Sequence, residues 1–188
     1  MPTIYDNIEN VLADALRQVL PGARSADFCI GYFNLRGWGQ VAHLVDEHLD
    51  GREGRHVRLL VGMSRPPEEE MRAQQAAIRR DERMDGPSAA LLRERAARSF
   101  KEQIEFGIPA AQAEATLRQL ARQLRQGQVK VKLFLRYPLH AKLYLVRRPD
   151  RVAPLVGYVG SSNLTLAGLS RQGELNVDVL DQDAAQKL

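Results

Sequence analysis

Apolar residues recur at two different periods along the chain, and these periods separate predicted helices from predicted strands. The first apolar positions follow helical spacing and stop at Pro21-Gly22, which predicts an amphipathic helix over residues 4–19. Residues 27–33 and 56–63 are rich in β-branched and aromatic side chains and predict two strands, with a helix between them that begins near Gly37. The first third of the chain therefore reads as a strand, helix, strand unit.

The segment from Ser64 to Gly127 has a different character. It is rich in Ala, Arg, Gln and Glu and has almost no strand-forming residues, which predicts helices. Three acids, Glu68 to Glu70, follow two prolines there. Because acids in the first turn of a helix are favoured by the helix dipole, they indicate a helix start rather than a metal site.

After Gly127 the apolar residues alternate, which is typical of strands. Short runs at residues 129–135, 139–146, 155–159 and 175–180 predict four of them. Together with the first two strands they predict an α/β fold, in which a mixed β-sheet is flanked by helices. We expect a single domain over residues 1–188, with a helical insertion at about 64–127 in the middle.

Composition excludes several classes of protein. The chain has 188 residues, of which 44% are hydrophobic and 27% charged, as in ordinary soluble proteins, and no apolar run is long enough to span a bilayer. Its N-terminus lacks the basic start and apolar stretch of a secretory signal, so we expect a cytoplasmic protein. Cys29 has no partner for an internal disulfide and is predicted to be a buried core residue.

Basic residues are concentrated in the second half of the chain. The formal net charge is +4 and the pI about 9.5. Between Val129 and Arg151 there are seven Lys or Arg residues against one acid, Asp150. Such a run is usually a solvated strand face, but here it surrounds a polar motif, so it favours a polyanionic partner.

That motif begins in the predicted strand at 139–146. Strand alternation would place His140, Lys142 and Tyr144 on one face, so that a histidine and a lysine project side by side. Eighteen residues after Lys142 comes Gly160-Ser161-Ser162-Asn163, followed by a short helical stretch at 164–169. Glycine allows the backbone to approach a ligand, and hydroxyl and amide groups donate to phosphate oxygens.

The two motifs together resemble the signature of the phospholipase D superfamily, HxKx4Dx6GSxN. The resemblance implies that His140 attacks phosphorus, that Lys142 and Asn163 hold the phosphoryl oxygens, and that Ser161 supports the site. It also implies that Glu174 orients a catalytic histidine. The implied enzyme is a metal-independent phosphodiesterase with a phosphohistidine intermediate and no cofactor.

The chain departs from this signature in two ways. Arg147 stands where the superfamily has its Asp, and the gap from Lys142 to Gly160 is six residues longer than the pattern. Because that Asp is neither nucleophile, phosphate clamp nor leaving-group acid, we expect the departures to affect local structure more than chemistry.

Residues 25–35, SADFCIGYFNL, are similar to the first strand of nuclease-like phospholipase D domains found ahead of DEAD/DEAH or SNF2-type helicases in prokaryotes. This similarity implies a nuclease acting on nucleic acid, with DNA preferred over RNA. No Walker motif is present, so an attached helicase would lie outside these 188 residues.

Superfamily members use a second histidine, from a second copy of the motif, to protonate the leaving group. This chain has one copy, which predicts a homodimer with a composite site containing His140 from both subunits. A second hypothesis is a catalytically inactive nucleic-acid-binding module that guides an attached helicase. A lipid phosphodiesterase is disfavoured, because the lipid enzymes of the superfamily generally carry two motifs in one chain or membrane-spanning segments.

Overall fold

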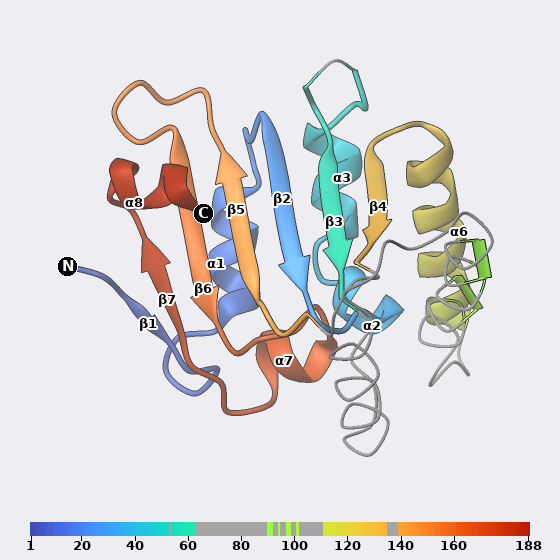
Figure 1. Ribbon diagram of the computed structural model, residues 1–188, viewed down its shortest axis with the longest axis horizontal. Helices are drawn as coiled ribbons and strands as arrows, with labels where there is room; N and C mark the ends of the chain where they lie inside the picture. The colour runs from blue at the N-terminus through green and yellow to red at the C-terminus, as the bar shows by residue number, and fades with distance from the viewer. Residues whose placement is uncertain are drawn as a thin grey trace.

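A mixed sheet forms the centre of the fold, as the sequence predicts. The structure is a computed structural model that describes residues 1–52, 54–62, 111–134 and 139–188, together with helical positions 90, 91, 94, 97, 98 and 101. The strands are β1 (Ile4–Tyr5), β2 (Ser25–Ile30), β3 (Val57–Val61), β4 (Val129–Leu133), β5 (Leu143–Arg147), β6 (Leu155–Gly160) and β7 (Asn176–Val179). They form one seven-stranded sheet in the order β1-β7-β6-β5-β2-β3-β4 (Figure 1).

Strand direction follows the connections. β2, β3 and β4 are parallel to one another, and the segments between them contain helices, as parallel pairs require. β5, β6 and β7 follow one another as antiparallel neighbours, and β5 also pairs antiparallel with β2. The ends of β2 and β3 therefore meet the start of β5 and the end of β6 at one edge of the sheet, where the predicted motifs lie.

In the part of the chain that the structure describes, the helices are short apart from α6. They are α1 (Leu12–Val19), α2 (Leu35–Trp38), α3 (Ala42–His48), α6 (Ala111–Arg125), α7 (Leu166–Ser170) and α8 (Gln182–Lys187). The predicted helical segment at 64–127 ends in α6, and most of its remainder lies outside the described residues. Within the described chain, no helix is long and apolar enough to cross a membrane.

The predicted helix over residues 4–19 is wrong in its first half. Ile4–Tyr5 pairs with β7 as an edge strand, and α1 begins only at Leu12. Between them the Asp6 carboxylate accepts hydrogen bonds from the backbone N–H groups of residues 8, 9 and 10 at 2.8–3.2 Å. This local turn competes with helix formation, and it leaves the side chain of Ile8 78% exposed.

One face of the sheet carries the main hydrophobic core. On β2 the inward residues are Ala26, Phe28 and Ile30, each at most 1% exposed, and they pack with apolar side chains of α1 and α3. Cys29 alternates to the other face and is only partly buried, so its predicted core position is wrong. On that second face, the unpredicted α8 and Leu188 cover Gly157 of β6.

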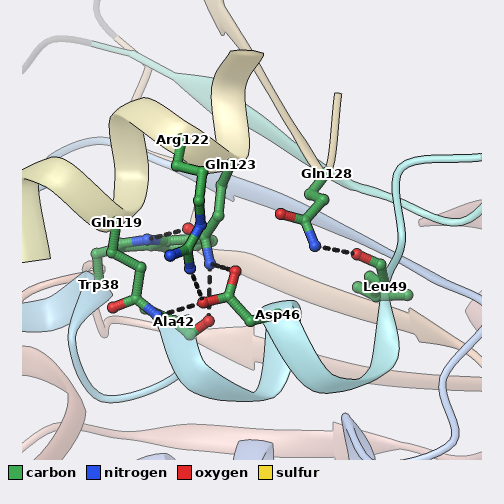
Figure 2. Close-up of polar contacts among 8 residues, drawn as sticks. All are labelled: Trp38, Ala42, Asp46, Leu49, Gln119, Arg122, Gln123 and Gln128. Atoms are coloured by element: carbon green, nitrogen blue, oxygen red, sulfur yellow. Dashed lines mark hydrogen bonds and ion pairs between the residues drawn. The ribbon is translucent and has the colours of Figure 1, made fainter. Parts of the chain in front are cut away.

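A polar cluster attaches α6 to α2 and α3, as Figure 2 shows. The buried Gln123 accepts from the Trp38 indole at 2.9 Å and donates to the Ala42 carbonyl at 2.8 Å and to Asp46 at 2.9 Å. The Asp46 carboxylate also accepts from two more α6 side chains, Gln119 and Arg122. Because buried polar groups are costly unless paired, this satisfied cluster fixes α6 against the domain.

Candidate active site

The segment from His140 to Lys142 leads into β5 rather than forming part of it. The predicted strand over 139–146 begins only at Leu143, and Tyr144 is buried while His140 is exposed and Lys142 partly exposed. Strand alternation therefore does not apply to His140 and Lys142, and the common face of the three side chains stays a prediction. The strand begins late because the preceding residue, Leu139, packs against Gly31 and Gly62 and so passes over the ends of β2 and β3.

Two glycines make that crossing possible. A Cβ at Gly31 would stand 2.9 Å from the Leu139 carbonyl oxygen, and one at Gly62 only 2.6 Å from it. Any larger residue at the end of β2 or β3 would push this segment away. The crossing places His140 at the edge of the sheet, exposed to solvent.

Lys142 and Asn163 converge at Gly31. The Lys142 Nζ and the Asn163 Oδ1 lie 3.6 Å and 3.3 Å from the point where a Gly31 Cβ would stand. Lys142 Nζ donates to the His140 carbonyl at 2.7 Å, which links its ammonium group to the His140 backbone. The predicted pair of phosphate-holding side chains is thus brought together from two different segments.

The backbone sets the orientation of the Asn163 amide. Tyr32 N–H donates to Asn163 Oδ1 at 2.9 Å. Because an N–H group must donate to oxygen, the Nδ2 end of the amide carries the donors that could face an anion. An ammonium and an amide donor are the groups that stabilise a phosphoryl oxygen.

Ser161 and Glu174 form a second pair. The Ser161 hydroxyl donates to the Glu174 carboxylate and accepts from Leu175 N–H at 2.9 Å, while Ser161 N–H donates to the Leu175 carbonyl at 3.0 Å. The loop after β6 is therefore bound to the segment before β7. The predicted orienting of His140 by Glu174 stays a prediction, since the hydrogen bond described for the carboxylate goes to Ser161.

Sequence reasoning missed the buried residues that hold the Gly-Ser-Ser-Asn loop. Asn176 Oδ1 accepts from Ser162 N–H at 3.2 Å, and its Nδ2 donates to Ser162 Oγ at 2.8 Å and to the Tyr5 carbonyl at 3.3 Å. The Tyr144 hydroxyl donates to the Ser162 carbonyl at 3.0 Å. Three atoms of Ser162 are thus bound by side chains that are at most 2% exposed, and Ser161 and Asn163 flank it.

A signal for Asn176 was present in the sequence: a polar residue at an inward position of an apolar strand. The register confirms that position, because Asn176 pairs with Gly160 and a Gly160 Cβ would stand 2.5 Å from Asn176 Oδ1. Burial, and secondarily the charge of Glu174, raise the pKa of Tyr144 well above its usual value. Tyr144 therefore stays a neutral donor to the loop at physiological pH.

Both departures from the signature lie at the C-terminal end of β5, away from the motif residues that precede this strand. Arg147 ends that strand and pairs with Asp27 of β2, and the longer gap forms the β5–β6 hairpin turn at residues 148–154. In Figure 1 this turn lies at the opposite end of the sheet from α2 and α7. Lys142, before β5, and Asn163, after β6, still converge at Gly31, and the expectation that the chemistry is unaffected stays a prediction.

Charged residues around Arg147 are arranged as an ion-pair cluster. Arg58 of β3 donates to both oxygens of Asp27. Burial acts to raise the pKa of Asp27, but hydrogen bonds and charges from Arg58 and Arg147 outweigh it and the pKa is lowered. Within the described residues no three His, Cys, Asp or Glu side chains gather as metal ligands, and Glu68 to Glu70 lie outside them.

Comparison with known proteins gives one family match. Residues 20–188 match the family described as "Cardiolipin synthase, PLD-like domain". No curated protein matches the chain. The match covers all of the motif residues and the strands β2 to β7.

Solved structures share the fold at low identity. NucT from Helicobacter pylori is 13% identical, with a TM-score of 0.50 over 100% of this chain and 89% of that one. Nuc from Salmonella typhimurium, described as a phospholipase D family member, is 14% identical, with a TM-score of 0.52 over 100% and 88%. Phosphatidylserine synthase from Haemophilus influenzae Rd KW20 is 18% identical, with a TM-score of 0.51, and the match covers 99% of this chain but 35% of that one.

Proposed function

The chain belongs to the family of phospholipase D-like domains, and from that premise we propose that it is a metal-independent phosphodiesterase acting on nucleic acid. The observation that carries the proposal is the convergence of Lys142 and Asn163 at Gly31, next to the exposed His140. A cation and an amide donor beside a histidine provide a phosphate clamp and a nucleophile.

The proposed reaction has two steps. A neutral His140 nitrogen attacks phosphorus, a P–N bond forms, the P–O bond breaks, and the leaving alkoxide takes a proton from a second, protonated histidine. Water then attacks the phosphohistidine, gives its proton to that second histidine and restores His140. Lys142 and Asn163 stabilise the charge on the phosphoryl oxygens in both steps, Ser161 supports the clamp, and Glu174 orients a histidine.

Nucleic acid is the proposed substrate because its backbone is a phosphodiester polyanion and the chain is basic, with a net charge of +4. DNA is proposed over RNA. An attached helicase and a cytoplasmic location stay predictions. If the wild-type protein binds nucleic acid but hydrolyses neither it nor bis(p-nitrophenyl) phosphate, the inactive binding module becomes the better description.

Hydrolysis of bis(p-nitrophenyl) phosphate is expected to persist in excess EDTA. The reason is that Lys142 and Asn163 provide the charge stabilisation that a metal ion provides in other nucleases. Release of p-nitrophenol measures it. Lys142→Met keeps a side chain of similar length without the charge and should lose most of the activity, which controls for contaminating nucleases. Loss in EDTA with recovery on adding Mg²⁺ or Mn²⁺ would contradict the mechanism.

The second histidine is proposed to come from another subunit, because the chain carries the motif once. Mixing wild-type with His140→Ala chains under exchange should then leave active composite sites only in wild-type homodimers. At equal mixing about a quarter of the activity should remain, whereas self-contained sites would leave about half, given random pairing. A linear dependence on the wild-type fraction would refute the shared site.

A further inference from the structure

A row of basic side chains crosses the sheet face opposite the main core. Asp27, Arg58 and Lys130 are direct neighbours across β2, β3 and β4, and they alternate with the inward residues of each strand. Arg147 of β5 reaches the same carboxylate, and Lys132 stands two residues beyond Lys130 on the same face. Figure 1 shows these four strands side by side. We call Arg147, Arg58, Lys130 and Lys132 the basic row.

We propose that the basic row binds the phosphate backbone of the nucleic-acid substrate away from the scissile bond. The inference rests on the proposed function for its choice of substrate. It concerns a surface that the catalytic residues do not include, since His140, Lys142 and Asn163 lie at the edge of the sheet beyond β2 and β3.

The row is positive and partly preorganised. It has four cationic side chains and one carboxylate, Asp27, which is only 20% exposed. Arg58 uses Nε and Nη2, and Arg147 uses Nη1, to bind that carboxylate, so both guanidinium groups are fixed while their side chains stay 57% and 39% exposed. Arginines held in place lose less side-chain entropy when they bind a phosphate.

The positive charges of the basic row act on a neighbouring histidine, His56. The pKa of His56 is lowered, first by burial and then by the positive charges of Lys130 and Arg58, while Asp27 has a smaller opposing effect. The two cations therefore outweigh the carboxylate at that position. A negatively charged backbone passing over the same strands would be attracted by the same two cations.

The row leads toward the catalytic edge. Lys132 is paired with Leu60, two residues before Gly62, where Leu139 crosses the end of β3. With about 3.3 Å per strand residue, Lys132 is roughly 7 Å and the Arg58–Lys130 pair roughly 13 Å along the sheet from that crossing. A nucleic-acid strand whose phosphate is held by Lys142 and Asn163 would therefore reach the basic row within a few nucleotides.

The experiment compares two double variants with equal charge change. Lys130→Gln/Lys132→Gln removes two cations of the row without touching the Asp27 cluster, and Arg118→Gln/Arg125→Gln removes two exposed cations of α6, which packs on the core side. Binding of a labelled DNA duplex is measured by anisotropy from low to moderate salt, in a His140→Ala background to prevent cleavage.

The row variant should bind about tenfold more weakly at low salt, and its slope of log affinity against log salt should fall by about 1.8, which is the value for two lost phosphate contacts. The α6 variant should change both much less. Equal effects of the two variants, or an unchanged slope in the row variant, would overturn the proposal and leave the two lysines as protection of the edge strand β4.

Hydrolysis of bis(p-nitrophenyl) phosphate by the row variant with His140 intact should equal that of the wild type, because this substrate is too short to reach the row. A loss of that activity would mean that Lys130 or Lys132 also affects the catalytic residues, and it would contradict the proposal that the basic row is separate from the catalytic site. The wild-type hydrolysis assay tests the catalytic function by itself, so failure there is distinguishable from failure of the row.

Discussion

His140→Ala is expected to lower phosphodiester hydrolysis by at least about a thousandfold, since it removes the proposed nucleophile. The free energy of unfolding should change by no more than about 0.5 kcal/mol, because the residue is exposed. Initial rates with bis(p-nitrophenyl) phosphate and urea unfolding of the same samples provide the two measurements. Nucleic-acid binding should be largely kept, because the basic surface is separate from the nucleophile.

His43→Ala is the matched control for this substitution. His43 is also exposed but lies on α3, away from the motif residues, so its removal should leave the rate within about twofold of wild type. If His140→Ala keeps a tenth of the activity, or if His43→Ala is equally inactive, the assignment of the nucleophile is wrong.

Asn176→Ala is expected to destabilise the fold and to lower activity in the molecules that stay folded. It removes three hydrogen bonds and leaves the Ser162 N–H and hydroxyl without their partner in a buried place. At about 1–3 kcal/mol for each unsatisfied group, the loss should reach roughly 3 kcal/mol. For a chain of this size that lowers the Tm by about 6–12 °C.

Activity separates a positioning role for Asn176 from a purely structural one. Because the bonded Ser162 lies between Ser161 and Asn163, a shift of about 1 Å in the loop should lower kcat about a hundredfold under conditions where the variant is still folded. Asp178→Ala serves as the control, since Asp178 is a buried inward residue of the same strand that accepts from Thr3 N–H at 2.7 Å. It should lose stability with little loss of kcat, and equal kcat losses in both variants would contradict the positioning role.

The parts of the fold that were predicted correctly depend on local sequence. Runs rich in β-branched and aromatic residues identified β2 and β3, and the alternating and short apolar runs after Gly127 identified β4, β6 and β7, each to within a few residues. The mixed sheet followed from their order. The predicted strand at 139–146 extended too far at its start, because the crossing of Leu139 over Gly31 and Gly62 is a contact between distant segments. The same local reasoning extended the first helix through the turn made by Asp6.

The site residues that belong to a sequence motif could be predicted. Those that only the tertiary fold brings to the site could not. Lys142 and Asn163 were named from the sequence and converge at Gly31, but their meeting place on β2 was not foreseen. Asn176 and Tyr144 act through hydrogen bonds to Ser162, 14 and 18 residues away along the chain. Such pairings depend on strand register, which a single sequence defines poorly.

The β5–β6 hairpin bears on how relatives of this chain can be recognised. The number of residues between the lysine and the glycine of the signature measures the length of a turn at the far end of the sheet, where Val152 is 87% exposed. Surface turns tolerate insertions, so evolution can lengthen this one without moving either half of the motif. A search pattern with a fixed spacing would therefore reject true homologues, whereas two short patterns joined by a variable gap would retain them.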